Sequence, residues 1–391
     1  MTALVPPVRP RVYWRPGDDP GDRRFATIGS LDLELGGSLP EVTVAYETWG
    51  TLNAARDNAI LVQHALTGDS HVSGPADAAH LTAGWWPGIV GPGCPIDTDE
   101  WFVVASNVLG GCQGTTGPSS LAPDGSPWGS RWPRVTVRDQ VAVEVAVADH
   151  LGIESFASVI GGSMGGLRAL EWLVGYPHRV RSAGVLACCA AASADQIGTQ
   201  TVQIQAITAD PKWAAGDYYD SAQGPPLDGM GIARRIAHLT YRTENEFAVR
   251  FDNLSQDGED AFGSTVPGVA QGAGRFAVTS YLDHQAARLA DRFDAGTYVA
   301  LTDAMSTHDV GRGRGGVAEA LSTIGVPVVV AGITSDRLYP IYLQRQLADL
   351  IPTARDLIAV HSDYGHDGFL IESEAVAGVV AQTLSAARSE R

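Results

Sequence analysis

Four short, almost entirely apolar runs constrain the fold of this chain more than any other feature. They are residues 59–63, 101–106, 156–160 and 183–189. Strands that are apolar at nearly every position are typical of a parallel sheet covered by helices on both faces. Between the second and third runs, Thr136 and Asp139 form the pattern of a helix capping box, and apolar residues follow at helical spacing. This alternation of strands and helices predicts an α/β fold with a mostly parallel sheet.

A long segment interrupts this pattern. Between residues 191 and 318 the apolar runs disappear, and Gln, Arg, Asp, Tyr and Phe are spread through stretches typical of helices and loops. Buried-strand patterns return at residues 326–333 and 357–360. We therefore expect a core made of residues 31–190 and 319–391, with residues 191–318 inserted as a helical lid over the sheet.

The start of the chain differs from both parts. Residues 1–30 are rich in Pro, Arg, Gly and Asp and predict a loosely ordered lead-in. Residues 31–35 alternate apolar and acidic side chains, as a half-exposed strand does, and residues 42–46 predict a second strand.

Composition excludes several classes of function. The formal net charge of −17 over 391 residues argues against nucleic acid or an anionic membrane as a partner. No apolar run approaches the ~20 residues of a membrane span, and the first residues lack a signal-peptide segment, so we expect a cytoplasmic protein. The four cysteines have neither metal-ligand spacing nor the density of a disulfide scaffold, so we expect buried or semi-buried thiols and no metal site.

The strongest local motif is Gly161-x-Ser163-x-Gly165. It follows the apolar run at 156–160 and precedes a helix-like segment at 167–174, which is the strand, sharp turn and helix context of a nucleophile elbow. In a chain with 45 glycines the five-residue pattern alone is equally typical of an ordinary turn. The flanking strand and helix favour Ser163 as a nucleophile.

A serine nucleophile needs a base and an acid that orients it. In α/β-hydrolase sheets these follow the serine in the order acid, then histidine. His366 lies in a glycine-flanked loop after the last predicted strand, whereas His361 directly continues that strand, so His366 is the better candidate. Asp336 directly follows the strand at 326–333, at the sheet edge where catalytic groups gather, although a turn Asp or a helix N-cap would have the same pattern.

The oxyanion of an acyl-transfer intermediate needs two backbone N–H donors. One comes from the residue after the nucleophile, here Met164, and the other from a loop after an earlier strand. Leu66, in the loop after residues 59–63, is the candidate for the second donor, with Thr67 as the next choice.

Together these motifs resemble homoserine O-acetyltransferases of the α/β-hydrolase superfamily. The segments that carry the resemblance are residues 64–69, 107–117, 161–166, 169–172, 332–336 and 365–369. The resemblance implies a ping-pong transfer of acetyl from acetyl-CoA, as co-substrate, through acyl-Ser163 to the hydroxyl of L-homoserine in methionine biosynthesis. It implies no permanently bound cofactor.

The resemblance also implies further roles. Arg234 matches a family arginine that binds the substrate, and an Arg suits a carboxylate because its planar fork binds two oxygens at once. Its neighbour Arg235 remains the alternative. Asp367 matches the position that would take the substrate ammonium group. The family also implies a homodimer formed through the inserted helices.

Other functions fit the same triad. A succinyl donor or a serine acceptor would leave Ser163, Asp336 and His366 unchanged, and so would a serine esterase with a wide, wet pocket. A noncatalytic scaffold of the same fold is the remaining alternative, and retention of all three residues argues against it.

Overall fold

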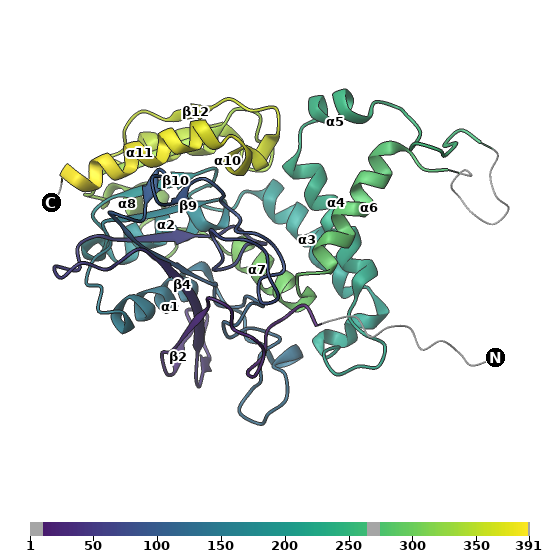
Figure 1. The fold of residues 1–391 in the computed structure, drawn as a ribbon, viewed down its shortest axis with the longest axis horizontal. Helices are drawn as coiled ribbons and strands as arrows, with labels where there is room; N and C mark the ends of the chain where they lie inside the picture. The colour runs from purple at the N-terminus through teal and green to yellow at the C-terminus, as the bar shows by residue number, and fades with distance from the viewer. Residues whose placement is uncertain (1–10, 264–273, 390–391) are drawn as a thin grey trace.

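An eight-stranded sheet forms the centre of the computed structural model, which describes residues 11–263 and 274–389 (Figure 1). Along the sheet the strands lie in the order β1 (Arg24–Thr27), β4 (Thr43–Trp49), β8 (Phe102–Ser106), β5 (Ala59–Gln63), β9 (Ser158–Gly162), β10 (Ala183–Leu186), β11 (Val328–Ile333) and β12 (Ile358–Val360). From β8 to β12 all neighbours are parallel, whereas β4 is antiparallel to both β1 and β8. The predicted fold class is confirmed.

The fully apolar runs became the central strands because both faces of the sheet are covered. Ala59 and Leu61 of β5 face a core cluster shared with α1 (Val137–His150), α2 (Met164–Gly175), α8 (Val317–Ser322) and α9 (Ile341–Leu350). Ile60 and Val62 face the opposite cluster, which is shared with α11 (Ser373–Ser389). Helix α1 begins at the predicted capping box, in which Thr136 and Asp139 bond each other's backbone N–H.

The N-terminal region departs from the sequence prediction. Residues 24–27 lie inside the expected lead-in, yet they form β1, which pairs along its whole length with β4. Residues 31–35 contribute only the two-residue strand β2 (Leu31–Asp32), which pairs with β3 (Ser38–Leu39) outside the main sheet. A further small pair is β6 (Val90–Gly91) with β7 (Ile96–Asp97).

In the described part of the chain between β10 and α8, the α-helices are α3 (Ala194–Thr208), α4 (Leu227–Tyr241), α5 (Glu244–Phe251), α6 (Ala277–Ala290) and α7 (Ala295–Ser306). Helix α4 packs against both α3 and α6, and these helices stand beside the sheet in Figure 1. Helix α7 lies closer to the sheet, and its Tyr298 and Leu301 belong to the main core cluster.

Short elements complete the described chain: the 3-10 helices η1 (Gly129–Arg131), η2 (Pro177–Arg179), η3 (Pro211–Gly216) and η4 (Gly365–Asp367), and α10 (Gly368–Ile371). The cysteines are free thiols, of which Cys112, Cys188 and Cys189 are buried and Cys94 is partly exposed, as expected. Within residues 11–263 and 274–389, none of the helices has both the length and the apolar character that crossing a bilayer requires.

Candidate active site

Ser163 occupies a sharp turn between β9 and α2. Its backbone has φ 57° and ψ −126°, a left-handed conformation that is costly for a residue with a Cβ. The turn closes so tightly that a Cβ on Gly161 would lie 2.4 Å from the Gly165 carbonyl carbon. A Cβ on Gly165 would lie 2.1 Å from the Gln63 carbonyl oxygen. The two glycines of the motif are therefore required by the backbone geometry.

The structure brings the three predicted triad residues into direct contact. His366 Nε2 lies 2.8 Å from Ser163 Oγ, and His366 Nδ1 lies 2.6 Å from Asp336 Oδ2. Asp336 Oδ1 accepts hydrogen bonds from the backbone N–H groups of Leu338 and Tyr339, both at 2.8 Å, so the carboxylate cannot rotate freely. The geometry is that of a nucleophile, a base and an orienting acid.

The environment of His366 increases the affinity of its imidazole for a proton. Burial alone would lower the pKa of His366, but the charge and hydrogen bond of Asp336 outweigh burial and raise the pKa above its ordinary value of 6.5. The loop that carries the imidazole is fixed by Gly365, whose φ is 63° and whose N–H donates to Ser335 Oγ at 3.1 Å.

One candidate oxyanion donor directly follows the nucleophile, and the other lines the same cavity. Met164 is the first residue of α2, where a backbone N–H has no acceptor within the helix. Leu66 borders the same cavity as Ser163.

The loop carrying Leu66 is held on both sides. Before it, His64 Nε2 accepts the Val108 N–H at 3.1 Å, and burial together with the charge of Arg168 lowers the pKa of His64 to about 3, which keeps this nitrogen free to accept. After it, Arg292 Nη1 donates to the Thr67 carbonyl oxygen at 2.7 Å.

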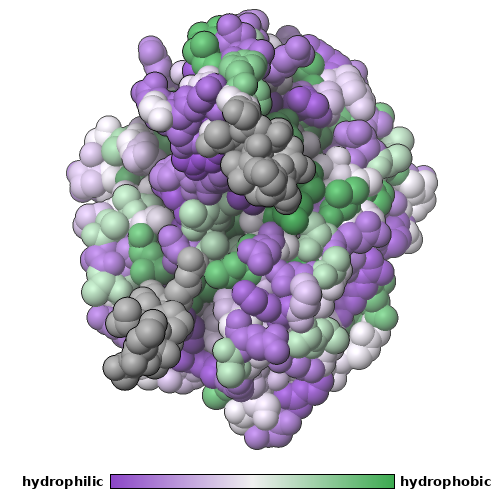
Figure 2. All heavy atoms as spheres, turned by 90° about the vertical axis from the view of Figure 1, so that its right-hand side faces the viewer, coloured by the Kyte–Doolittle hydropathy of each residue, from purple (hydrophilic) through white to green (hydrophobic). Residues whose placement is uncertain are grey.

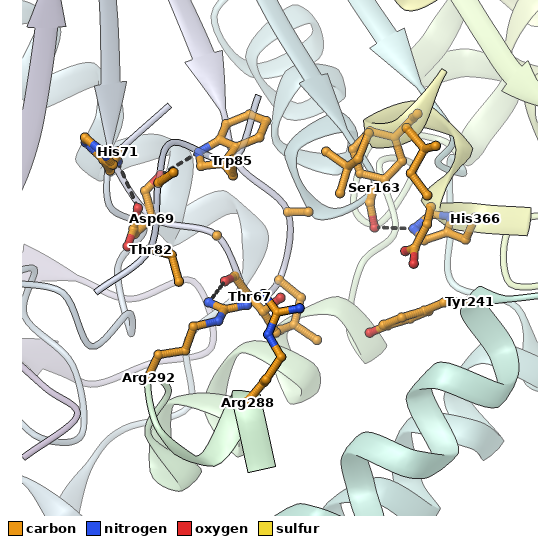
Figure 3. Close-up of a pocket in the computed structure, with 18 of the residues that line it drawn as sticks. Thr67, Asp69, His71, Thr82, Trp85, Ser163, Tyr241, Arg288, Arg292 and His366 are labelled. Atoms are coloured by element: carbon orange, nitrogen blue, oxygen red, sulfur yellow. Dashed lines mark hydrogen bonds between the residues drawn. The ribbon is translucent and has the colours of Figure 1, made fainter. Parts of the chain in front are cut away.

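A cavity of about 320 Å³ adjoins Ser163 and His366 (Figure 3). It is lined by Leu66, Arg234 and Asp367 among the residues predicted from sequence. The cavity is therefore bounded by sheet-edge loops on one side and by inserted helices on the other.

The structure separates the two neighbouring arginines. Arg234 lines the cavity, and its guanidinium carbon lies 5.6 Å from the centre of the Tyr241 ring. Among the described residues, the buried Nε of Arg234 has no hydrogen-bond partner. Arg235 instead donates twice to Asp283 Oδ1, at 2.7 and 3.1 Å. Arg234 is therefore the arginine available to a bound anion.

Asp367 also lines the cavity, directly after His366. Its Oδ2 accepts a hydrogen bond from Arg242 Nη1 at 3.1 Å, so one of its two carboxylate oxygens is already engaged. The other oxygen of Asp367 could contact a cationic group of a ligand next to His366. The ion pair with Arg242 limits the movement of the Asp367 side chain.

Sequence reasoning missed two further cations and an aromatic wall. Arg288 at the end of α6, Arg292 just beyond it, and Tyr241 at the end of α4 all line the cavity. In Figure 3 Tyr241 lies beside His366, whereas the two arginines lie across the cavity from Ser163. Burial and the nearby Arg234 lower the pKa of Arg292 to about 10. The four-residue spacing of Arg288 and Arg292 predicts a shared helix face, but not which way that face points.

Comparison with known proteins supplies the family. A family model described as alpha/beta hydrolase fold matches residues 58–373. A homoserine O-acetyltransferase of Nocardia farcinica is 57% identical over 371 residues, covering 95% of this chain and 94% of that protein. The chain belongs to the homoserine O-acetyltransferase family. Another member, from Mycobacterium tuberculosis, is 56% identical over 95% of each chain.

Solved structures share the fold but carry different names. Esterase E22 superposes with a TM-score of 0.83 at 27% identity, over 93% of this chain and 99% of that one. A homoserine O-acetyltransferase from Bacillus anthracis superposes with the same TM-score at 24% identity, over 93% and 97% of the two chains. The backbone fold alone therefore does not distinguish a transferase from an esterase.

We expect the reactivity of Ser163 to follow the protonation of His366. Labelling of Ser163 by a fluorophosphonate should accelerate as pH rises through the pKa of His366, that is, above about pH 6.5, because only the neutral imidazole accepts the serine proton. Asp336→Asn should slow labelling by roughly 10⁴-fold. It should also move the rise to lower pH, because Asp336 is what raises the pKa of His366.

The matched control is Asp363→Asn, which changes an exposed aspartate three residues before His366. It should label at the native rate. An Asp336→Asn variant with a native rate and pH profile would contradict the assignment of Asp336 as the orienting acid.

Proposed function

We propose that this chain transfers acetyl from acetyl-CoA to the side-chain hydroxyl of L-homoserine through an acetyl-Ser163 intermediate. The observation that carries the proposal is the buried contact of Ser163 with His366 on the floor of a cavity that Arg234 also lines. A nucleophile that shares a cavity with a guanidinium whose Nε has no hydrogen-bond partner among the described residues suits an acceptor that carries a carboxylate. The named relatives share this activity by name at 56–57% identity.

In the first half-reaction, His366 takes the proton of Ser163 while Oγ attacks the thioester carbonyl. The N–H groups of Met164 and Leu66 would hold the developing oxyanion, which is the interaction that contributes most in acyl transfer. The C–S bond then breaks, and His366 returns its proton to the departing CoA thiolate. Asp336 stabilises the imidazolium throughout.

In the second half-reaction, the same imidazole takes the proton of the homoserine hydroxyl, whose oxygen attacks the acetyl-serine. Collapse of the tetrahedral intermediate breaks the bond to Oγ, which recovers its proton from His366. O-acetylhomoserine leaves and Ser163 is restored. The product is an activated homoserine, consistent with a role in methionine biosynthesis.

Arg234 and Asp367 would hold the two charged ends of homoserine. Arg234 offers its fork to the carboxylate, and Asp367 next to the catalytic histidine offers an oxygen to the ammonium group. Both groups line the cavity together with Ser163 and His366, so a molecule that bridges them would lie close to the acyl-serine. Such a bridge would position the hydroxyl for attack.

Residues 191–318 would act as a lid that excludes water. Arg234, Tyr241, Arg288 and Arg292 all come from this segment and form one wall of the cavity. Excluding water favours transfer, because water competes with homoserine for the acetyl-serine. We propose that the enzyme acts in the cytoplasm, where acetyl-CoA is available and the free cysteines stay reduced.

Hydrolysis is the second candidate function. The likeness to esterase E22, with a TM-score of 0.83 at 27% identity, is the observation that favours it. Hydrolysis uses the same triad and requires only that water reach the acyl-serine.

The deciding measurement is CoA release from acetyl-CoA with and without homoserine. We expect sustained release that requires homoserine, and Ser163→Ala should reduce it by roughly 10⁴- to 10⁶-fold. Sustained release without an acceptor would favour the hydrolase. Serine as acceptor and succinyl-CoA as donor, in the same assay, test the remaining alternatives. Near-native transfer by Ser163→Ala would overturn the mechanism.

Arg234→Ala should raise the KM for homoserine by roughly 10- to 100-fold, because it removes a charge-assisted hydrogen bond to the carboxylate. Acetylation of Ser163 by acetyl-CoA alone, followed by mass spectrometry, should stay within a few-fold of native. The matched control is Arg235→Ala, whose native side chain pairs with Asp283. If Arg235→Ala raised the KM and Arg234→Ala did not, the carboxylate role would move to Arg235.

We also propose that two copies associate through residues 191–318. Many of the exposed large hydrophobic side chains lie there: Ile197, Val202, Ile232, Leu239, Val249, Leu254 and Phe262. Figure 2 views this side of the molecule, where hydrophobic and hydrophilic residues are interspersed. Apolar side chains concentrated on one segment suit an interface with a second copy.

Light scattering after size exclusion should give twice the mass of one chain. Val249→Asp and Val202→Asp should each shift the mass toward the monomer, because each buries a charge in the interface. Tyr342→Asp, which changes an exposed aromatic on α9, is the control and should leave the dimer intact. A native monomer at all concentrations, or a dimer unaffected by both lid variants, would refute this interface.

A further inference from the structure

A second cluster of chemically active side chains lies beside the catalytic cavity, and the triad does not use it. Glu47 extends from β4, and His71 and His80 come from the long loop between β5 and β6. All three side chains are buried, with exposed fractions between 1% and 4%. His71 also lines the catalytic cavity.

The spacing of the three side chains matches that of ligands around a small metal ion. His71 Nδ1 lies 2.9 Å from Glu47 Oε2, and His80 Nε2 lies 3.3 Å from Glu47 Oε1. One ligand atom from each residue falls within 4.8 Å of the others. Two bonds of about 2.0–2.1 Å in a tetrahedral arrangement span about 3.3 Å, so these separations are suitable for zinc.

The outer nitrogen of each imidazole faces an oxygen, as metal-bound histidines require. His71 Nε2 lies 3.2 Å from the Pro75 carbonyl oxygen, and His80 Nδ1 lies 3.2 Å from Asp77 Oδ1. A ring that donates its outer N–H to such an oxygen presents the lone pair of its inner nitrogen to Glu47. In that tautomer the two lone pairs would face carboxylate oxygens at 2.9 and 3.3 Å and repel them, and a cation bound between them would remove this repulsion.

The backbone around the two rings is shaped to hold them. A Cβ on Gly74 would lie 2.7 Å from His71 Cε1, and a Cβ on Gly21 would lie 2.7 Å from His80 Cε1. The rings stack with their centres 3.9 Å apart. Ser70 Oγ donates to Glu47 Oε1 at 2.8 Å, which orients the carboxylate.

We propose that Glu47, His71 and His80 bind one divalent transition-metal ion, with zinc as the best match to two imidazoles and a carboxylate. The catalytic cavity, which His71 borders, would be the entry path. The ion would attach the loop between β5 and β6 to the sheet at two points. That loop contributes Leu66, Asp69, Thr82 and Trp85 to the cavity wall, so the ion would stabilise the wall without taking part in acyl transfer.

The alternative occupants of the cluster are protons. If each ring carried two protons, His71 could donate to Glu47 and Pro75, and His80 could donate to Glu47 and Asp77, without a metal. Two positively charged rings would then stack with their centres 3.9 Å apart, which is electrostatically unfavourable. The two arrangements differ in a measurable way, because only a metal site binds zinc in a fixed ratio to the chain.

The test uses the purified full-length protein, stripped with a chelator and then given Zn²⁺ or Co²⁺. We expect one zinc per chain by mass spectrometry after desalting, a visible absorption band for bound Co²⁺, and a rise in Tm with zinc. His80→Gln should lose the bound ion. Asp77→Asn, which changes a half-exposed outer partner and should fold normally, should weaken zinc binding by roughly 10- to 100-fold.

The control is His178→Gln, which removes an exposed histidine and should bind zinc as the native chain does. Less than about 0.1 zinc per chain in the native protein would overturn the proposal and favour the protonated pair. Native stoichiometry in both His80→Gln and Asp77→Asn would likewise overturn it, because the ion would then lie elsewhere. None of these readouts depends on acetyl transfer, so they stand apart from the proposed activity.

Discussion

A buried ion pair beneath the nucleophile connects the parts of the active site. Arg168 on α2 and Glu144 on α1 are almost completely inaccessible, and Arg168 also donates to the His64 carbonyl oxygen at the end of β5. Glu144 accepts further hydrogen bonds from Gln63 and Trp172 at 2.6 and 2.7 Å. Breaking such a pair on one side typically costs about 3–5 kcal/mol, because a charge is left unpaired in the interior. The helix after Ser163 and the loop that carries Leu66 are therefore fixed relative to each other.

The buried ion pair and the sheet around it stabilise the strained turn at Ser163. A left-handed backbone at a residue with a Cβ costs on the order of 1–3 kcal/mol and persists only where the surroundings determine it. Here β9 lies between β5 and β10 in the sheet, and α2 is tied to α1 by the ion pair. The strain holds Ser163 Oγ toward His366, so the stability of the sheet is used to direct one hydroxyl group.

The parts of the site that sequence could predict follow from local patterns. Residues 59–63 were predicted to form a strand because a short, nearly continuous apolar run is typical of a strand buried on both faces. Ser163 directly follows β9, Asp336 lies three residues after β11, and His366 lies in the segment after β12. Edge strand β1 was missed because it pairs with only one strand, β4. Its mixed polar and apolar composition therefore lacks the apolar pattern of the central strands. Arg288 and Arg292 were missed because helical spacing does not specify which face of an inserted helix meets the cavity. Glu47, His71 and His80 were missed because a strand and a long loop bring them together without any fixed spacing.

The choice between transfer and hydrolysis then depends on the walls of the cavity. Esterase E22 shares the fold with a TM-score of 0.83, so a sheet of this kind supports either chemistry. In this chain the loop after β5 is held by Arg168 at its start and by Arg292 at Thr67, and Arg292 belongs to the inserted segment. This wall is therefore held by contacts from both the core and the inserted segment. Arg292 thus both lines the cavity and holds its wall, so the inserted segment and the loop after β5 are joined at the cavity itself.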